Sequence, residues 1–411
     1  MAYETLYIIL DSAQMVKEIR KTGKNCSVSE QTGDKSMTEI FLIRHAQAEG
    51  NRYHMMQGHW DGGVTALGRR QIEELAERFR CAPPDAVYAS DLYRAVVTAE
   101  AAARWRRLPI HRLLALREIN IGPWEGRFLG DLLWEQPENV ARFFGDPDHW
   151  ALPGAETYAQ VTERAYAALE GIAQRHEGQR VVVVSHGITI RCLIARILGI
   201  TIKETRQLPV AGNTAVTHLV WEDGRFRAQT INDDSHLSEA CRVSWRRAGD
   251  LRAEAMDLRN ERDDYIACYA DAWRFVHGDF TDFEPLAYFE AARRHQRMLP
   301  GSVLRFYEGE KSAGLLDLDP LRGKRAGYGW ISLLYLEEAY RGRGCGVQLL
   351  ARAYTLFRAE GRRSIRLHVS AENQTAVAFY LREGFRQIGS EGYGRDKLLL
   401  MEKSLEGRNN A

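Results

Sequence analysis

The sequence has few of the residues that mark secreted, metal-binding or disordered proteins. Its 411 residues include only 6 cysteines and 11 prolines. The cysteines are Cys26, Cys81, Cys192, Cys241, Cys268 and Cys345. They form no C-x-x-C pair and no zinc-finger spacing, which favours reduced thiols in the cytoplasm over disulfides or a metal centre. No apolar run approaches the roughly 20 residues that a membrane-spanning helix needs, so we expect no membrane contact.

The chain also lacks an excess of charge of either sign. Its formal net charge is +1, and charges of both signs are interspersed. A protein that binds nucleic acid regardless of sequence needs a basic face, so nucleic acid is not an expected partner. The length of 411 residues exceeds one ordinary core and predicts two domains. No linker rich in Gly, Ser or Pro separates them, and the pattern of residues 237–254 predicts a helical connector.

The first pattern that points to chemistry is a short apolar strand followed by an Arg-His pair. Residues 40–43 are all apolar and predict a buried strand, which Arg44 and His45 follow directly. Open α/β sheets build their sites at the carboxyl ends of parallel strands. A histidine beside a guanidinium group at such a strand end is suited to attack phosphorus.

Three later segments support this interpretation. Residues 87–94 predict a strand, a cap at Ser90 or Asp91, and a helix whose positive end carries Arg94. The loop 116–126 offers two carboxylic acids. Residues 181–184 are four valines, which predict a fully buried strand that ends at His186.

Residues 38 to about 237 resemble the histidine phosphatase superfamily, which has the phosphoglycerate-mutase-like fold. The matching segments are Arg44-His45 with Asn51, Thr65-Ala66-Leu67-Gly68-Arg69, Ser90-Asp91-Leu92-Tyr93-Arg94, Leu116-Arg117-Glu118 through Trp124-Glu125-Gly126, Pro153-Gly154-Ala155-Glu156-Thr157, and Ser185-His186-Gly187. Where such proteins often have Gly-Glu-Thr after the pair, this chain has Ala46-Gln47-Ala48. None of these replacements touches a residue that must do chemistry.

The resemblance implies a mechanism that needs no metal. His45 would attack as a neutral imidazole, and Arg44, Arg94 and His186 would surround the phosphate oxygens. Asn51 and Gly187 would add further contacts to the phosphate. Glu118 would protonate the leaving oxygen and later take a proton from water. Glu125 stays an alternative to Glu118, and Glu156 is more consistent with a structural role.

A second site is predicted in the other half of the chain. Residues 329–336 predict a strand, and the glycine-rich turn 341–346 leads into an amphipathic helix. A strand, a glycine-rich turn and a helix start together bind phosphate groups, because the backbone amides and the helix dipole face the anion. Another strand is predicted at 364–369.

The second half, about residues 255 to 405, resembles the GNAT-type N-acetyltransferases. The acetyl-CoA motif matches at Arg341, Gly344 and Gly346, and a second block matches at Asn373, Ala376, Tyr380, Gly384 and Phe385. The resemblance implies that the turn Arg341, Gly342, Arg343, Gly344, Cys345 and Gly346 holds the pyrophosphate of acetyl-CoA. The backbone of Leu334 and Leu336 would pair with the pantetheine arm, Asn373 would brace it, and Tyr380 would protonate the leaving thiolate. We expect the small side chain of Cys345 to fill space in this turn and not to act as a nucleophile.

The sequence thus predicts an N-terminal three-layer α/β/α domain with a mostly parallel sheet, followed by an α+β GNAT-type domain with a mixed, mostly antiparallel sheet. The predicted bounds are an extension over 1–37, domains over 38–236 and 255–405, the connector 237–254, and a tail over 406–411. Met37 is expected to be the biological start.

The predicted protein is a bifunctional cytoplasmic enzyme that combines a metal-independent phosphatase with an acetyl-CoA-dependent N-acetyltransferase. Its expected partners are a small phosphorylated metabolite and an amine acceptor, and a homodimer is left open. Two alternatives stay open: a phosphoglycerate-mutase-type phosphotransferase, and a phosphatase regulated by a domain that only senses acetyl-CoA.

Overall fold

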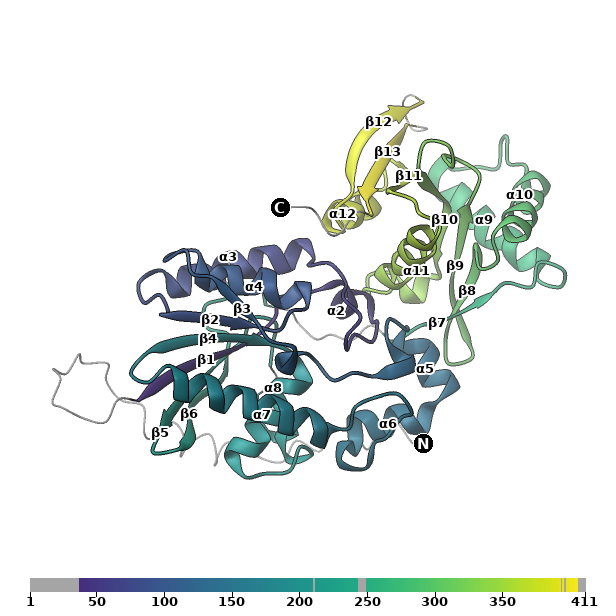
Figure 1. Cartoon of the computed structure of the whole chain (residues 1–411). Coiled ribbons are helices and arrows are strands. Elements are labelled where there is room, and N and C mark those ends of the chain that lie inside the picture. Colours follow the sequence, from purple (N-terminus) through teal and green to yellow (C-terminus); the bar gives the residue numbers. More distant parts are fainter. Residues whose placement is uncertain (1–36, 210, 243–248, 393, 395–396, 406–411) are drawn as a thin grey trace.

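The computed structural model describes residues 37–209, 211–242, 249–392, 394 and 397–405, which form two domains (Figure 1). The predicted extension before Met37 and the predicted tail lie outside the described residues. The N-terminal domain is built on a six-stranded sheet of order β3-β2-β4-β1-β5-β6. Its strands are β1 (Thr38–Arg44), β2 (Ala86–Ala89), β3 (Ile110–Arg112), β4 (Arg180–Ser185), β5 (Val216–Glu222) and β6 (Arg225–Asp233).

The sheet is mostly parallel, as predicted. β1, β2, β3 and β4 pair in parallel, while β5 and β6 add an antiparallel edge. Alternate residues of β1 face opposite layers, because side chains of a strand point to opposite faces with a period of two. Leu42 packs toward α7 (Tyr158–Arg175) and α8 (Gly187–Leu198), and Ile43 packs toward α3 (Ala66–Arg80) and α4 (Tyr93–Ala103). The predicted three-layer arrangement is therefore confirmed.

The start of α4 differs from the prediction. Neither Ser90 nor Asp91 caps it, because the N-cap position belongs to Leu92, whose side chain makes no cap hydrogen bond. The carboxylate of Asp61, from another loop, accepts the N–H of Tyr93 at 2.7 Å. A local sequence pattern could not reveal a cap that arrives from a distant segment.

The C-terminal domain contains a seven-stranded sheet of order β12-β13-β11-β10-β9-β8-β7. Its strands are β7 (Arg252–Ala255), β8 (Val303–Glu308), β9 (Lys311–Asp319), β10 (Tyr328–Leu336), β11 (Ser364–Ser370), β12 (Arg386–Glu391) and β13 (Leu398–Ser404). Only the β10–β11 pair is parallel among the described strand pairs, so the sheet is mostly antiparallel, as predicted.

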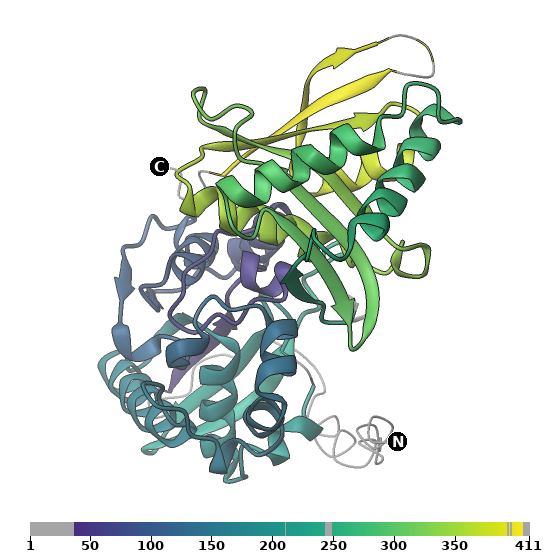
Figure 2. The ribbon, with the colours of Figure 1, turned by 90° about the vertical axis from the view of Figure 1, so that its right-hand side faces the viewer.

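Helices cover both faces of this second sheet. Figure 2 shows α9 (Arg262–His277) and α10 (Pro285–Met298), in green, lying across one face. α11 (Gly346–Ala359) and α12 (Gln374–Arg382) cover the other face. Three short helices of the N-terminal domain, α2 (Glu49–Tyr53), α5 (Leu129–Glu135) and α6 (Pro137–Gly145), complete the set of described α-helices.

The predicted helical connector over 237–254 is wrong for the residues that the structure describes. Residues 237–242 form turns, and Arg252–Ala255 form strand β7, which pairs with β8 at the edge of the C-terminal sheet. The open edge of β8 offers backbone hydrogen bonds to this segment. These stabilise a strand more than the weakly helical pattern of its apolar residues stabilises a helix. In the described part of the chain, no helix is both long and apolar enough to cross a membrane.

A buried polar cluster under α10 makes the stability of the C-terminal domain depend on pH. His295 Nδ1 lies 2.8 Å from Asp317 Oδ1 and Nε2 lies 3.6 Å from Asp319 Oδ2. Burial opposes the charge on His295, but the two carboxylates outweigh it and raise the pKa of His295 to about 9. Because the folded pKa exceeds the unfolded value of about 6.5, this stabilisation is complete below about pH 6.5 and is lost as pH rises through about 9.

We therefore expect the C-terminal domain to lose about 3 kcal/mol of unfolding free energy between pH 6 and pH 9.5 through this cluster. Urea unfolding of the full chain at both values measures the loss, and the His295→Gln variant, which cannot titrate here, should lack this component. An equal pH dependence in both proteins would contradict the assignment.

Candidate active sites

The first site lies where β1 and β4 end side by side. The register places Arg44 opposite Ser185, so His45 and His186 leave the sheet at the same edge. Their ring centroids are 5.1 Å apart, and both residues are buried, with 2% and 0% of their surface exposed. The two strands that the sequence predicted thus bring together both predicted histidines.

His45 is held as a neutral base. Its Nδ1 lies 2.7 Å from the carbonyl oxygen of Ala46, which fixes the proton on Nδ1 and leaves the lone pair on Nε2. Burial, followed by the positive charges of Arg94 and Arg44, keeps the pKa of His45 well below the ordinary histidine value. An uncharged imidazole with a free Nε2 is the form required for nucleophilic attack.

Buried nitrogen atoms with no protein partner gather around these histidines. Among the described residues, Arg44 Nε, Arg94 Nε and both ring nitrogens of His186 are buried without a hydrogen-bond partner. Gly187 packs against the guanidinium group of Arg44, since a Cβ added at Gly187 would lie 3.4 Å from Arg44 Nε. Buried polar atoms almost always have a partner in folded proteins, so the N–H groups in this set are suited to bind an anion.

Other donors of the two guanidinium groups hold them in place. Arg94 is fully buried and donates to the carbonyl oxygens of Trp60 at 3.0 Å and Gly58 at 2.7 Å, with Asp61 Oδ1 at 3.3 Å. Arg44 Nη1 donates to the carbonyl oxygen of Ala211 at 2.5 Å. These contacts fix the positive charges before any substrate arrives.

Glu118 lies at the amino end of α8, next to His186. Its Oε1 accepts from the N–H groups of Ile119 and Thr189 and from the hydroxyl of Thr189, while among the described residues its Oε2 accepts from the N–H of Ile188 alone. The free lone pair on Oε2 suits a group that exchanges a proton with substrate or water. Glu125, the alternative, accepts backbone N–H groups of four residues of two loops, namely Gly58, His59, Trp60 and Ile121, which indicates a structural role.

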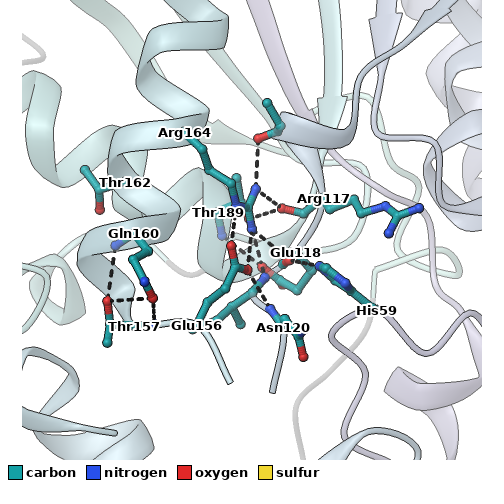
Figure 3. A network of polar contacts seen from close by, with 12 residues as sticks. His59, Arg117, Glu118, Asn120, Glu156, Thr157, Gln160, Thr162, Arg164 and Thr189 are labelled. Atoms are coloured by element: carbon teal, nitrogen blue, oxygen red, sulfur yellow. Dashed lines mark hydrogen bonds and ion pairs between the residues drawn. The ribbon is translucent and has the colours of Figure 1, made fainter. Parts of the chain in front are cut away.

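Figure 3 shows that Arg164, on α7, holds the backbone around Glu118. Its guanidinium group donates to the carbonyl oxygens of Ala115 at 2.8 Å, Arg117 at 2.8 Å and Glu118 at 3.0 Å. The carboxylate of Glu156 binds Arg164 through both oxygens, at 2.7 and 2.9 Å. These contacts indicate a structural role for Glu156.

Asn51 lies on α2, and its amide is oriented by its neighbours. Its Oδ1 accepts the N–H of Ala48 at 3.0 Å and the Nδ2 of Asn213 at 3.3 Å. Asn213 also donates to the carbonyl oxygen of His45 at 3.0 Å. The oxygen of Asn51 is thus engaged, and its Nδ2 is the end left for an anion.

Sequence reasoning missed Asp61, Arg164 and Asn213. Asp61 caps α4 and pairs with Arg94, Arg164 fixes the Glu118 loop, and Asn213 orients Asn51. Each acts on a residue that is remote in the chain, so a single sequence carries no local signal for it. Of the three, only an acidic partner such as Asp61 could have been anticipated, because a buried arginine such as Arg94 needs a nearby carboxylate.

The second site lies where β10 and β11 separate. β10 pairs with β11 only over Tyr328–Ile331, while its pairing with β9 continues to Leu336. The residues of β10 beyond Ile331 therefore have one open edge. An extended ligand can add to this edge as a further strand. The carbonyl oxygen of Leu336 already accepts Arg341 Nε at 2.8 Å, so Leu334 is the freer of the two predicted positions.

The glycine-rich turn leads directly into α11. Gly342 and Gly344 have φ values of +72° and +83°, a backbone that glycine adopts most easily. Arg343 is exposed and lies 3.3 Å from Glu308. Cys345 is 1% exposed, and burial raises the pKa of its thiol, which agrees with a filler and not a nucleophile.

The predicted residues of α12 lie near this turn. Tyr380 is 8% exposed, and burial raises the pKa of its hydroxyl, so the group stays protonated. The ring of Phe379, its neighbour, lies 3.1 Å from where a Cβ on Gly346 would be. The Oδ1 of Asn373 caps α12 by accepting the N–H of Ala376 at 3.0 Å, which leaves its Nδ2 for a ligand.

Comparisons with known proteins match both halves of the chain. Residues 40–234 match the model of the histidine phosphatase superfamily (branch 1), and residues 262–385 match that of the acetyltransferase (GNAT) family. The chain is 32% identical over 211 residues to the metal-independent phosphoserine phosphatase of Arabidopsis thaliana, a match that covers 50% of this chain and 85% of the relative. It is 29% identical over 206 residues to the probable phosphoglycerate mutase GpmB of Salmonella paratyphi C, covering 49% of this chain and 95% of the relative. The solved structure of Bacillus stearothermophilus YhfR has 31% sequence identity and a TM-score of 0.47, and covers 48% of this chain and 98% of that one.

The contacts of Arg164 generate a test of the first site. We expect Arg164→Met to lower kcat for p-nitrophenyl phosphate about 10- to 100-fold with a smaller change in KM, because Arg164 places Glu118 without touching the substrate. Arg196→Met removes an exposed arginine that pairs with Glu163 on the surface, and serves as the control. A change confined to KM would show that Arg164 does not act through Glu118.

Proposed function

We propose that this chain, which belongs to the histidine phosphatase superfamily in its N-terminal half and carries a GNAT acetyltransferase domain in its C-terminal half, hydrolyses phosphomonoesters at His45 and acetylates amines from acetyl-CoA. The observation that carries the first activity is the set of buried, unpartnered nitrogen atoms of Arg44, Arg94 and His186 around a neutral His45.

Hydrolysis proceeds in two steps in this proposal. His45 Nε2 attacks the phosphorus atom in line, the bond to the ester oxygen breaks, and that oxygen takes a proton from Glu118 Oε2. Water then attacks the phosphohistidine and gives its proton to Glu118, which releases inorganic phosphate and restores the free imidazole. Arg44, Arg94 and His186 stabilise the equatorial oxygens in both steps.

Glu118 Oε2 has a lone pair with which it can take a proton from water, which is what hydrolysis of a phosphohistidine requires. The proposed substrate is a small phosphorylated metabolite. The phosphoserine phosphatase among the relatives makes amino-acid phosphates one class to test.

A screen over sugar, nucleotide and amino-acid phosphates tests the first activity. We expect release of inorganic phosphate from at least one class, and a loss of more than about 1,000-fold in His45→Ala, because no other group can take over the nucleophile. Isomerisation without phosphate release, in the presence of excess bisphosphate, would show a mutase instead.

The proposed acetyl transfer uses the open edge of β10 and the turn before α11. Acetyl-CoA supplies an acetyl group as a thioester. The backbone amides of the turn 341–346 would bind its pyrophosphate, and the open edge of β10 would align its pantetheine arm. As the acceptor nitrogen bonds to the acetyl carbon and the carbon–sulfur bond breaks, Tyr380 would give its hydroxyl proton to the released sulfur. The acceptor amine loses its proton to solvent, and Glu337 and Glu338 lie at the end of β10, where they can relay it.

The role of Tyr380 can be tested by thiol release. We expect Tyr380→Phe to lower kcat about 100-fold with a panel of amines while acetyl-CoA binding is retained, because the general acid is lost and the ring is kept. Tyr328→Phe, at the far end of β10, is the matched control. Acetyl-CoA binding by the wild type without acetylation of any amine would favour the acetyl-CoA-sensing role instead.

A further inference from the structure

The short helix α2 joins the phosphate site to the other domain. α2 has five residues, and its N-cap position is Ala48, which offers no side-chain cap. Helices of this length are unstable alone, so its conformation depends on tertiary contacts. In Figure 1, α2 lies between the N-terminal sheet and α11.

The outer face of α2 is bound by residues of the C-terminal domain. Arg358, in the last turn of α11, donates to both carboxylate oxygens of Glu49, at 2.7 and 2.9 Å. Lys403 Nζ, on β13, lies 3.1 Å from the hydroxyl of Tyr53. Glu49 and Tyr53 are 8% and 4% exposed, so this face is buried by the second domain. A bidentate Arg–carboxylate pair fixes geometry as well as charge.

Glu49 also binds the loop that holds Arg94. Its N–H donates to the carbonyl oxygen of Gly63 at 2.9 Å, and its Oε2 accepts the N–H of Gly63 at 3.1 Å. The same loop contains Trp60 and Asp61, which bind the guanidinium group of Arg94.

The same helix carries Asn51, whose Oδ1 is engaged and whose Nδ2 is left for the phosphate. Glu49 thus lies on the same helix as Asn51 and binds the loop that holds Arg94, so it is connected to two groups of the phosphate site.

We propose that Arg358 of the acetyltransferase domain is a positioning residue for phosphoester hydrolysis: by clamping Glu49 it fixes α2 and the 58–63 loop, so that Asn51 and Arg94 meet the phosphate group. This proposal rests on the proposed phosphatase function. It means that the phosphate site is completed by a residue of the second domain, far from the site in the sequence.

The full-length chain, with p-nitrophenyl phosphate as the probe, tests the proposal. We expect Arg358→Gln to lower kcat/KM about 10-fold, mainly through a higher KM, because Asn51 and Arg94 bind the phosphate in the ground state as well as in the transition state. Arg358→Lys, which keeps the charge, should recover part of the loss. The Kd for acetyl-CoA should stay at the wild-type value, which would show that α11 is intact.

Arg352→Gln is the matched control. Arg352 lies on the same helix and also crosses between the domains, to Asp131 at 2.6 Å, but it does not touch α2. Its kcat/KM should stay within about 2-fold of wild type. Equal losses of kcat/KM in both variants would show that any weakening of the contact between the domains slows hydrolysis, which overturns the proposal. A wild-type KM in Arg358→Gln would also overturn it.

Vanadate binding separates this proposal from the phosphatase function. Protection against thermal unfolding by vanadate reports on the phosphate site without turnover, and Arg358→Gln should need about 10-fold more vanadate than Arg352→Gln. If the wild type releases no phosphate that depends on His45, the proposed function fails, and equal vanadate protection in the two variants overturns the role of Arg358.

Discussion

The parallel pairing of β1 with β4 is the constraint on which the first site depends. It brings two segments more than a hundred residues apart to one edge of the sheet, with Arg44 opposite Ser185. The side chains of a strand alternate between faces, so a slip of one residue would turn His45 away from His186. The valines of β4, buried on both faces, fix the register, because every shift would expose or crowd part of the apolar core.

Around that edge the protein concentrates positive charge without neutralising it fully. Arg94 is fully buried and meets one carboxylate, Asp61, and two carbonyl oxygens, while its Nε is unpartnered in the described structure. Charges that stay in a fixed, dry position need no rearrangement when a phosphoryl group arrives. Burial, and after it these charges, lower the pKa of His45 and so keep the attacking nitrogen unprotonated.

Sequence reasoning succeeded where the information is local. The apolar run before His45, the valines before His186 and the glycines of the turn 341–346 each specify an element within a few residues. It failed where a partner comes from elsewhere: the cap of α4 is Asp61 and not Ser90 or Asp91, and the segment 252–255 is a strand because β8 offers an open edge. Arg164 and Asn213 were missed for the same reason, since they act on backbone that folding brings to them.

The apolar part of the domain boundary has a practical consequence. Tyr53, Met55 and Phe128 of the N-terminal half belong to the same apolar cluster as Tyr354 and Phe385 of the other half. Cutting the chain between its halves would expose these side chains to water and leave α2 without its support. An expressed fragment that ends near residue 236 should therefore self-associate or precipitate more readily than the intact protein, so the halves are best purified and crystallised together.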